Sequence, residues 1–252
     1  MQKYKDYLVK LLPGIIFILF WQFYISYKGL EFYYGLPSRI ATYLVKKTLD
    51  GSLLYDTFLT SIETIIGFIA GNIIGVAIGL SLWFSKTVFN ISKPYIVALG
   101  SSPIFALAPL MIIWFGTGIF SKIMMATLST LFIALFQAYS GASEVNPDYI
   151  KLLKVYKASR MQIFRKIIVP SSVVWVISAF KINVGFALLG AFIGEYISSS
   201  AGLGHLILVA SGLFDISLVL TGVFMMIVIA LLLNYIVGKI ERPLKKAVVK
   251  YL

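Results

Sequence analysis

The sequence predicts an all-α protein that crosses a membrane about six times. Hydrophobic residues make up 60% of the 252 positions and charged residues only 13%, a balance outside the range of soluble globular domains. Apolar runs long enough for a helix to cross a hydrocarbon core of ~30 Å recur along the whole chain. The charged residues gather between these runs. Together these observations indicate a polytopic membrane protein.

Each expected span is an apolar run with polar or basic residues at its ends. The first run ends in a cluster of Trp, Phe and Tyr, which is typical of the headgroup level of a bilayer. No small-residue cleavage site follows it, so we expect a retained anchor rather than a signal peptide. In chain order, the six expected spans are Leu11–Tyr27, Leu59–Phe84, Val88–Phe115, Ile123–Tyr139, Ser171–Ile193 and Ile216–Val237.

The second span carries glycines at every fourth position. Gly67, Gly71, Gly75 and Gly79 form three overlapping GxxxG units on one helix face. Glycines at this spacing let two helix backbones approach closely. We expect this face to pack within one subunit, and the alternatives are a dimer axis or a solute path.

The third span is interrupted by Pro94, by the segment Gly100–Pro103 and by Pro109. Breaks at membrane depth expose backbone polar groups, so such a region usually faces protein or a water-filled cavity. Ser101, Ser102 and Pro103 are therefore candidates for lining a solute path; the alternative is a kinked packing helix. Between the last two spans, a turn-rich segment leads into Leu206–Leu213, which is too short to cross and is expected to be re-entrant or interfacial.

A few polar residues fall inside apolar spans, where a charge costs at least ~2.5–3.5 kcal/mol unless it is paired or hydrated. Glu63 and Lys181 are expected at compatible depths, so they are a candidate ion pair. Glu195 is a candidate gate or substrate contact, or else an interfacial carboxylate. Asn183 is a further candidate for the path.

The net charge of +12 is explained by membrane orientation better than by nucleic acid binding. With six spans, the N-terminus, the Lys86–Lys93 turn, residues 144–166 and the C-terminal tail share one side. Most basic residues lie on that side. Cytoplasmic loops carry an excess of Lys and Arg, so both termini are expected in the cytoplasm.

Residues 144–166 combine six basic side chains with an apolar stripe, between two spans. From the residues alone, this segment either lies on a lipid surface or docks on another protein. The chain contains no cysteine and a single histidine, His205, so we expect no metal site. It has no phosphate-binding loop and no hydrolase motif, and therefore we expect no enzymatic activity and no cofactor bound by this chain.

The segment Lys157-Ala-Ser-Arg-Met-Gln-Ile-Phe-Arg-Lys-Ile-Ile-Val-Pro170 resembles the cytoplasmic signature of binding-protein-dependent ABC transporter permeases, EAA followed by GAS…QIFRKVVLP. The segments Trp114–Gly118, Gly194–Ile197 and Gly202–Leu206 are similar to the nitrate, sulfonate and taurine branch. The chain departs from the signature at two places: Lys151-Leu-Leu stands where the family has Glu-Ala-Ala, and Lys157 stands where it has glycine. A glutamate at position 63 is more like the branch that serves thiamine precursors.

The resemblance implies a type I importer permease fold, in which residues 1–55 precede a transmembrane core of residues 56–245 and a tail of residues 246–252. It implies a homodimer, two separate ATPase subunits that bind ATP and Mg²⁺, and an extracellular solute-binding protein. The solute would be a sulfonate-, taurine- or nitrate-like anion or a thiamine-precursor-like heterocycle. The residues implied at the ATPase interface are Lys151, Leu153, Val155, Tyr156, Lys157, Ala158, Ser159, Met161, Gln162, Phe164 and Arg165.

Two other transporter classes stay open on the residues alone. An ion-coupled secondary transporter commonly has more spans or an internal repeat. The membrane scaffold of an energy-coupling-factor importer also presents basic cytoplasmic helices to ATPases, but it is not expected to carry the segments around Trp114 and Gly202.

Overall fold

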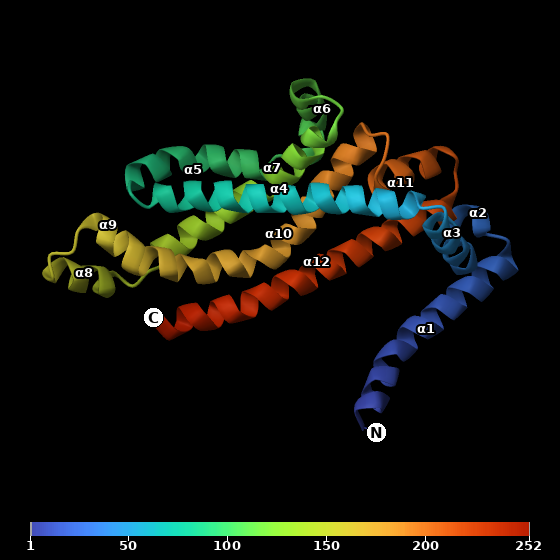
Figure 1. The fold of residues 1–252 in the computed structure, drawn as a ribbon, viewed down its shortest axis with the longest axis horizontal. Helices are drawn as coiled ribbons and strands as arrows, with labels where there is room; N and C mark the ends of the chain where they lie inside the picture. The colour runs from blue at the N-terminus through green and yellow to red at the C-terminus, as the bar shows by residue number, and fades with distance from the viewer. Residues whose placement is uncertain (1, 252) are drawn as a thin grey trace.

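The computed structural model describes the backbone of residues 2–251 and the side chains of residues 12–241 and 243, and within that part it contains helices and no strand. The all-α prediction is confirmed. Within residues 2–251, twelve α-helices and one short π-helix follow each other (Figure 1). They are α1 (Gln2–Lys28), α2 (Glu31–Tyr34), α3 (Pro37–Leu49), α4 (Ser52–Leu82), α5 (Lys86–Ser101), α6 (Ile104–Phe115), α7 (Ile119–Ser143), α8 (Pro147–Val155), α9 (Arg160–Ile163), η1 (Phe164–Ile168), α10 (Val169–Ile197), α11 (Leu203–Gly212) and α12 (Ile216–Tyr251).

In the described part of the chain, four helical segments are long and apolar enough to cross a membrane: α4, α7, the continuous run from α9 to α10, and α12. They coincide with the second, fourth, fifth and sixth expected spans. The third expected span is a bent pair, because α5 and α6 meet at 92° across a short break. The first expected span lies in α1, where the side chains of residues 2–11 are outside the described part, so its crossing stays a prediction.

The glycine face of α4 packs directly on α7. A Cβ placed on Gly75 would lie 2.8 Å from the Ala134 Cβ, and one on Gly79 would lie 2.9 Å from the Ala138 Cβ. Real Cβ contacts are wider than this, so the two backbones approach to a distance that only glycine allows. The expectation that these glycines serve packing within one subunit is confirmed.

On its other side α7 packs against α10, again through small residues. Ala126 is fully buried, and a Cβ on Gly190 would lie 2.7 Å from its Cα. A buried amide pair ties α10 to α4: Asn183 Nδ2 donates to Asn72 Oδ1 at 2.7 Å. The helices α4, α7 and α10 are therefore the rigid centre of the bundle.

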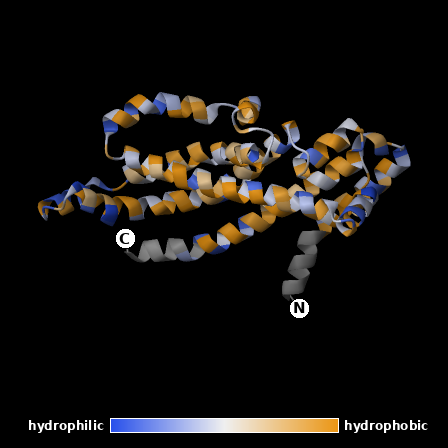
Figure 2. Ribbon diagram, turned by 45° about the horizontal axis from the view of Figure 1, so that its top comes forward, coloured by the Kyte–Doolittle hydropathy of each residue, from blue (hydrophilic) through white to orange (hydrophobic). Residues whose placement is uncertain are grey.

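The two ends of the bundle differ in composition. Figure 1 places α8, α9 and the C-terminal end of α12 at one end, and α2, α3 and α11 at the other. Hydrophobic residues cover the long helices, while hydrophilic residues gather on α8 and α9 (Figure 2). These ends are called the α8 end and the α11 end below.

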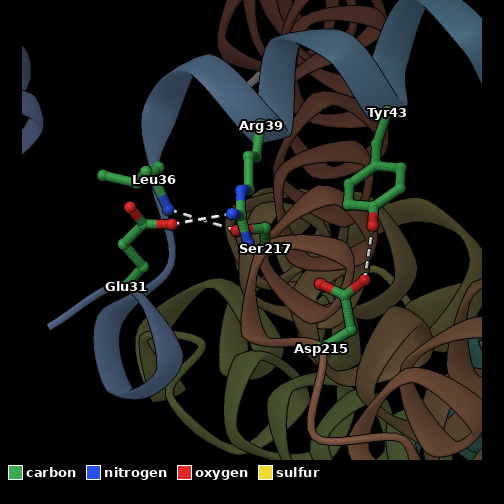
Figure 3. Close-up of polar contacts among 6 residues, drawn as sticks. All are labelled: Glu31, Leu36, Arg39, Tyr43, Asp215 and Ser217. Carbon is green, nitrogen blue, oxygen red and sulfur yellow. Dashed lines mark hydrogen bonds and ion pairs between the residues drawn. The ribbon is translucent and has the colours of Figure 1, made fainter. Parts of the chain in front are cut away.

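Three polar contacts fasten α3 and its preceding turn at the α11 end (Figure 3). Tyr43 donates its hydroxyl to Asp215 at 2.5 Å, and this bond is the main reason that the pKa of Tyr43 is raised above its ordinary value. Asp215 also accepts from the Leu218 N–H in the first turn of α12. The remaining contacts are the Leu36 N–H to Ser217 Oγ at 3.1 Å and the Arg39–Glu31 ion pair at 2.7 Å.

Candidate functional site

The basic segment of residues 144–166 folds into two short helices that project from the α8 end (Figure 1). Asn146 caps α8 by accepting the Asp148 N–H. Ser159 and Gln162 form a capping box at the start of α9, in which each side chain accepts the other residue's N–H. Such reciprocal caps satisfy N–H groups that a helix start leaves unpaired. The segment is thus an ordered structure with its own local signals.

The turn between α8 and α9 has the geometry that normally requires glycine. Lys157 has a φ of 56°, its N–H donates to Lys154 O at 2.9 Å, and the Ala158 N–H donates to Leu153 O at 3.0 Å. These two bonds define a Schellman motif, and Leu153 and Ala158 both pack against the cluster of Ala142, Ile163 and Ile168. The turn of the family signature is therefore kept although lysine replaces its glycine.

An aromatic base holds this segment against the end of α4. Phe164 packs on Trp83 and Phe84, with ring centroids 5.6 and 4.6 Å apart. The Arg160 guanidinium lies 5.5 Å from the Trp83 ring centroid and donates to the Phe84 carbonyl. Arg160 and Phe164 thus fix the segment to the turn between α4 and α5.

The implied interface residues fall into an exposed set and an anchoring set. Leu153, Ala158 and Phe164 pack in the cluster around Ile163 and Ile168, so they hold the segment in place. The apolar side chains at the tip stand free: Val155 is 78% and Tyr156 75% exposed. The other exposed members are Lys151, Lys157, Ser159, Met161, Gln162 and Arg165.

A cavity of about 420 Å³ opens beside the bend between α5 and α6. Ser102 and Pro103 line it, and Ser101 does not. Its walls carry two serines, three phenylalanines and no charged side chain. The full lining is Leu99, Gly100, Ser102, Pro103, Ile104, Phe105, Leu107, Leu128, Ser129, Phe132, Ile133, Phe186, Leu189 and Ile193.

Other candidate residues have structural partners. Asn183 is fully buried in its bond to Asn72, so it does not face this cavity. Lys181 pairs with Glu241 at 2.8 Å, and the predicted pair with Glu63 is wrong. Both Lys181 and Glu241 face the α10–α12 contact, whereas Glu63 is buried on α4 near the α11 end.

Glu195 is fully buried and forms part of a hydrogen-bonded network, instead of facing a path. Its Oε1 accepts from Thr60 Oγ1 at 2.7 Å and its Oε2 from the Gly204 N–H at 2.7 Å. Gly202, with a φ of 103°, leaves room for this carboxyl, since a Cβ there would lie 2.7 Å from Glu195 Oε2. The segment Gly202–Leu206 is thus explained: both of its glycines lie against the buried Glu195.

Sequence reasoning missed two groups of residues. Lys122, which directly precedes the fourth expected span, is 1% exposed and donates to the Thr117 and Gly118 carbonyls. Trp83 and Phe84 stand at the end of the second expected span. In the sequence, the one visible feature of these two residues is that they lie next to the Lys86 turn. That position does not reveal that Phe84 contacts Arg160, 76 residues later in the chain. No group of three metal-ligating side chains occurs among the described side chains.

A family model for "binding-protein-dependent transport system inner membrane component" matches residues 71–246. The chain belongs to this family. It is therefore a permease of the multi-pass inner-membrane type, a transporter component rather than an enzyme, and this membership separates it from secondary transporters and energy-coupling-factor scaffolds.

Named relatives of the permease differ in the solutes that their names state. A formylaminopyrimidine transport permease from Halalkalibacterium halodurans is 32% identical over 68% of this chain and 69% of its own length. A putative aliphatic sulfonates transport permease from Bacillus subtilis is 28% identical, over 94% and 86%. A probable ABC transporter permease from Haemophilus influenzae is 30% identical, over 79% and 80%.

Solved structures share the fold of the permease at low sequence identity. An inward-facing MetNI methionine ABC transporter chain matches with a TM-score of 0.69 and 16% identity, covering 79% of this chain and 98% of that chain. A bacterial ABC transporter involved in alginate import matches with a TM-score of 0.58 and 17% identity, covering 96% and 99%. The predicted type I importer permease fold is confirmed.

Proposed function

We propose that this permease is one half of a homodimeric, ATP-driven importer, and that the segment of residues 144–166 docks on a separate ATPase subunit that binds ATP and Mg²⁺. An extracellular solute-binding protein delivers the solute at the α11 end. Closure of two ATPase subunits moves the docked segment, and the bundle then alternates between outward and inward access.

The observation that carries this proposal is the construction of the α8–α9 segment. Its inner side is fixed by Arg160 and Phe164, while Val155 and Tyr156 present apolar surface at its tip. Aromatic side chains in a well-packed interface supply much of the binding energy between proteins. A segment that only lay on lipid would not need the rigid attachment to the α4–α5 turn.

The same construction supports the orientation. The basic residues at the α8 end belong in the cytoplasm by the positive-inside rule, which is where an ATPase partner has access to ATP. We propose that both termini and residues 144–166 are cytoplasmic, and that α2, α3 and α11 face outward in the inner membrane of a bacterial cell.

For the solute, we propose a small flat heterocycle rather than an anion. The cavity at the α5–α6 bend has no charged residue in its lining. A sulfonate or nitrate ion entering it would therefore lose its hydrating water and gain no counter-charge. Phe105, Phe132 and Phe186 offer rings for stacking. The Ser102 and Ser129 hydroxyls donate to backbone carbonyls, which leaves their oxygens free to accept from ring or amino N–H groups.

Docking is tested by co-purification of the tagged permease with its ATPase. The unmodified permease is expected to retain the ATPase, and Val155→Asp or Tyr156→Asp is expected to reduce the retained amount at least about tenfold, a loss of ~1.4 kcal/mol. The matched control is Leu49→Asp: Leu49 is 83% exposed at the opposite end, so this change should retain the ATPase in full.

Equal retention by all three variants would refute docking through this segment. An isolated permease that transports without any ATPase would refute the importer altogether. The solute class is tested by competition: an unlabelled aminopyrimidine should inhibit uptake of a labelled one in cells that carry the importer, and taurine or nitrate should not. The reverse order of inhibition would contradict the heterocycle proposal alone.

A further inference from the structure

Two carboxyl groups are buried against each other near the α11 end. Glu63 on α4 is 1% exposed and Glu195 on α10 is 0% exposed. Thr60, one turn before Glu63 on α4, donates to Glu195 Oε1 at 2.7 Å, so both carboxyl groups belong to the same buried contact between α4 and α10. The proposed transport cycle uses neither of them. We call Glu63 and Glu195 the carboxyl pair.

The two members of the carboxyl pair have different surroundings. Glu195 accepts hydrogen bonds on both oxygens, from Thr60 and from the Gly204 N–H, an arrangement that stabilises an ionised carboxylate. Glu63 has a buried Oε2 with no hydrogen-bond partner. An ionised group with an unpaired buried oxygen is strongly disfavoured, so Glu63 is the member whose neutral form fits its site.

The charge balance of the cluster agrees with this assignment. Glu195 and Lys122 on α7 are the charged groups that act on Glu63, and Asp56 on α4 also acts on Glu195. Lys122 is buried and its ammonium group is bound to two carbonyls. Lys122 is the one cation in this cluster among the described side chains, so two ionised glutamates beside Asp56 would exceed the available counter-charge. The nearest titratable group on α11 is His205, next to Gly204.

The pair acts directly on α11. Side chains of α4 and α10 accept the N–H groups at the start of that helix. The Leu203 N–H donates to Thr60 Oγ1 at 3.0 Å, the Gly204 N–H to Glu195 Oε2, and the Gly202 N–H to Asp56 Oδ1 at 2.8 Å. The helix start thus depends on Glu195 keeping its place. Two ionised carboxyl groups in contact would repel each other and displace Glu195 from these donors.

We propose that Glu63 and Glu195 share one proton, and that the proton-sharing pair positions α11 against α4 and α10. Glu63 donates its O–H to Glu195, which remains ionised and caps α11. Removal of the proton at alkaline pH places two charges together and loosens α11. Glu63 is therefore a positioning residue that acts on α11 through Glu195.

The chain contains no cysteine, so an introduced cysteine is a unique probe of this movement. Ala210 on α11 is fully buried, and Ala210→Cys should react with a polar maleimide only when α11 moves. Ser200→Cys, at an exposed position before α11, corrects for the increase of thiolate with pH. The ratio of the two labelling rates, measured on the purified protein in detergent, reports opening of α11.

With Glu63 in place, the ratio should rise with pH above neutral, approaching about tenfold per pH unit for release of one proton. In a Glu63→Gln background the ratio should stay flat, because the glutamine amide donates to Glu195 at every pH. Thr60→Val removes a donor to Glu195 but not the proton, so it should raise the ratio at all pH values and keep the slope. A flat ratio with Glu63 present, or an equal slope in Glu63→Gln, would overturn the proposal.

Infrared spectroscopy of the unmodified chain gives a second test that needs no variant. A protonated buried carboxyl has a carbonyl stretch separate from that of carboxylates. This band should be present at neutral pH and disappear over the same pH range as the labelling change; its absence at neutral pH would overturn the proposal. Neither test requires transport, so this proposal is tested separately from the importer function.

Discussion

Replacing Lys157 by glycine should stabilise the turn between α8 and α9. Lys157 has a φ of 56° in a Schellman motif, and a left-handed conformation costs a residue with a Cβ about 1–2 kcal/mol. Glycine removes this strain but loses about 0.4–1 kcal/mol through the greater freedom of the unfolded chain. The net gain is therefore about 1 kcal/mol or slightly less.

Hydrogen exchange measured by mass spectrometry follows this gain at the amides of Lys157 and Ala158. A local stabilisation of about 0.5–1 kcal/mol slows exchange through local opening roughly two- to fivefold. Lys154→Gly is the matched control, because Lys154 lies within α8, where glycine destabilises a helix by ~1 kcal/mol, and exchange should become faster. Equal exchange in both variants and the unmodified permease would refute the strain argument at Lys157.

Three further outcomes are expected. Gly75→Ala should disrupt the α4–α7 contact and reduce the yield of folded permease in detergent, whereas Gly185→Ala, where a Cβ meets no atom within 4 Å, should not; equal yields would contradict the packing argument. Tyr43→Phe should destabilise the α11 end by about 1 kcal/mol. The pKa of Tyr43 is raised by its bond to Asp215. The stabilisation from this bond is therefore present below pH ~10 and is lost as the pH rises through the higher folded pKa. Thermal melts of the phenylalanine variant should not show this loss. Arg160→Lys should weaken ATPase-coupled transport without loss of folding, since lysine keeps the charge but not the planar contact with the aromatic base; unchanged transport would contradict its role as an anchor.

Features set by local sequence were predicted with their positions. The apolar runs gave the segments α4, α7, α10 and α12, because a helix that satisfies its own backbone hydrogen bonds is the stable form of such a run in lipid. The break at Ser102 and Pro103 was also visible, since proline lacks an N–H and restricts the residue before it. The 92° bend was not predictable from those residues, because neighbouring helices decide the direction that a freed chain takes.

Partners across the fold were predicted less well. The interpretation of Glu63 and Lys181 as a pair relied on depth alone, and depth does not state which helix face a residue occupies or which helices are neighbours. Lys181 lies against Glu241 of α12, and Glu63 lies against Glu195 of α10. Both outcomes depend on the order of helices around α7, which no local pattern records.

The sequence by itself determined that this permease is a helical membrane protein, where its apolar runs lie, and that residues 144–166 form a basic amphipathic segment, because periodicity, hydropathy and capping act between residues close in the chain. The tertiary structure alone decided that Phe164 is an anchor while Tyr156 is exposed, and that Glu195 caps α11. These depend on contacts between residues distant in the chain, whose energies arise only when packing brings them together.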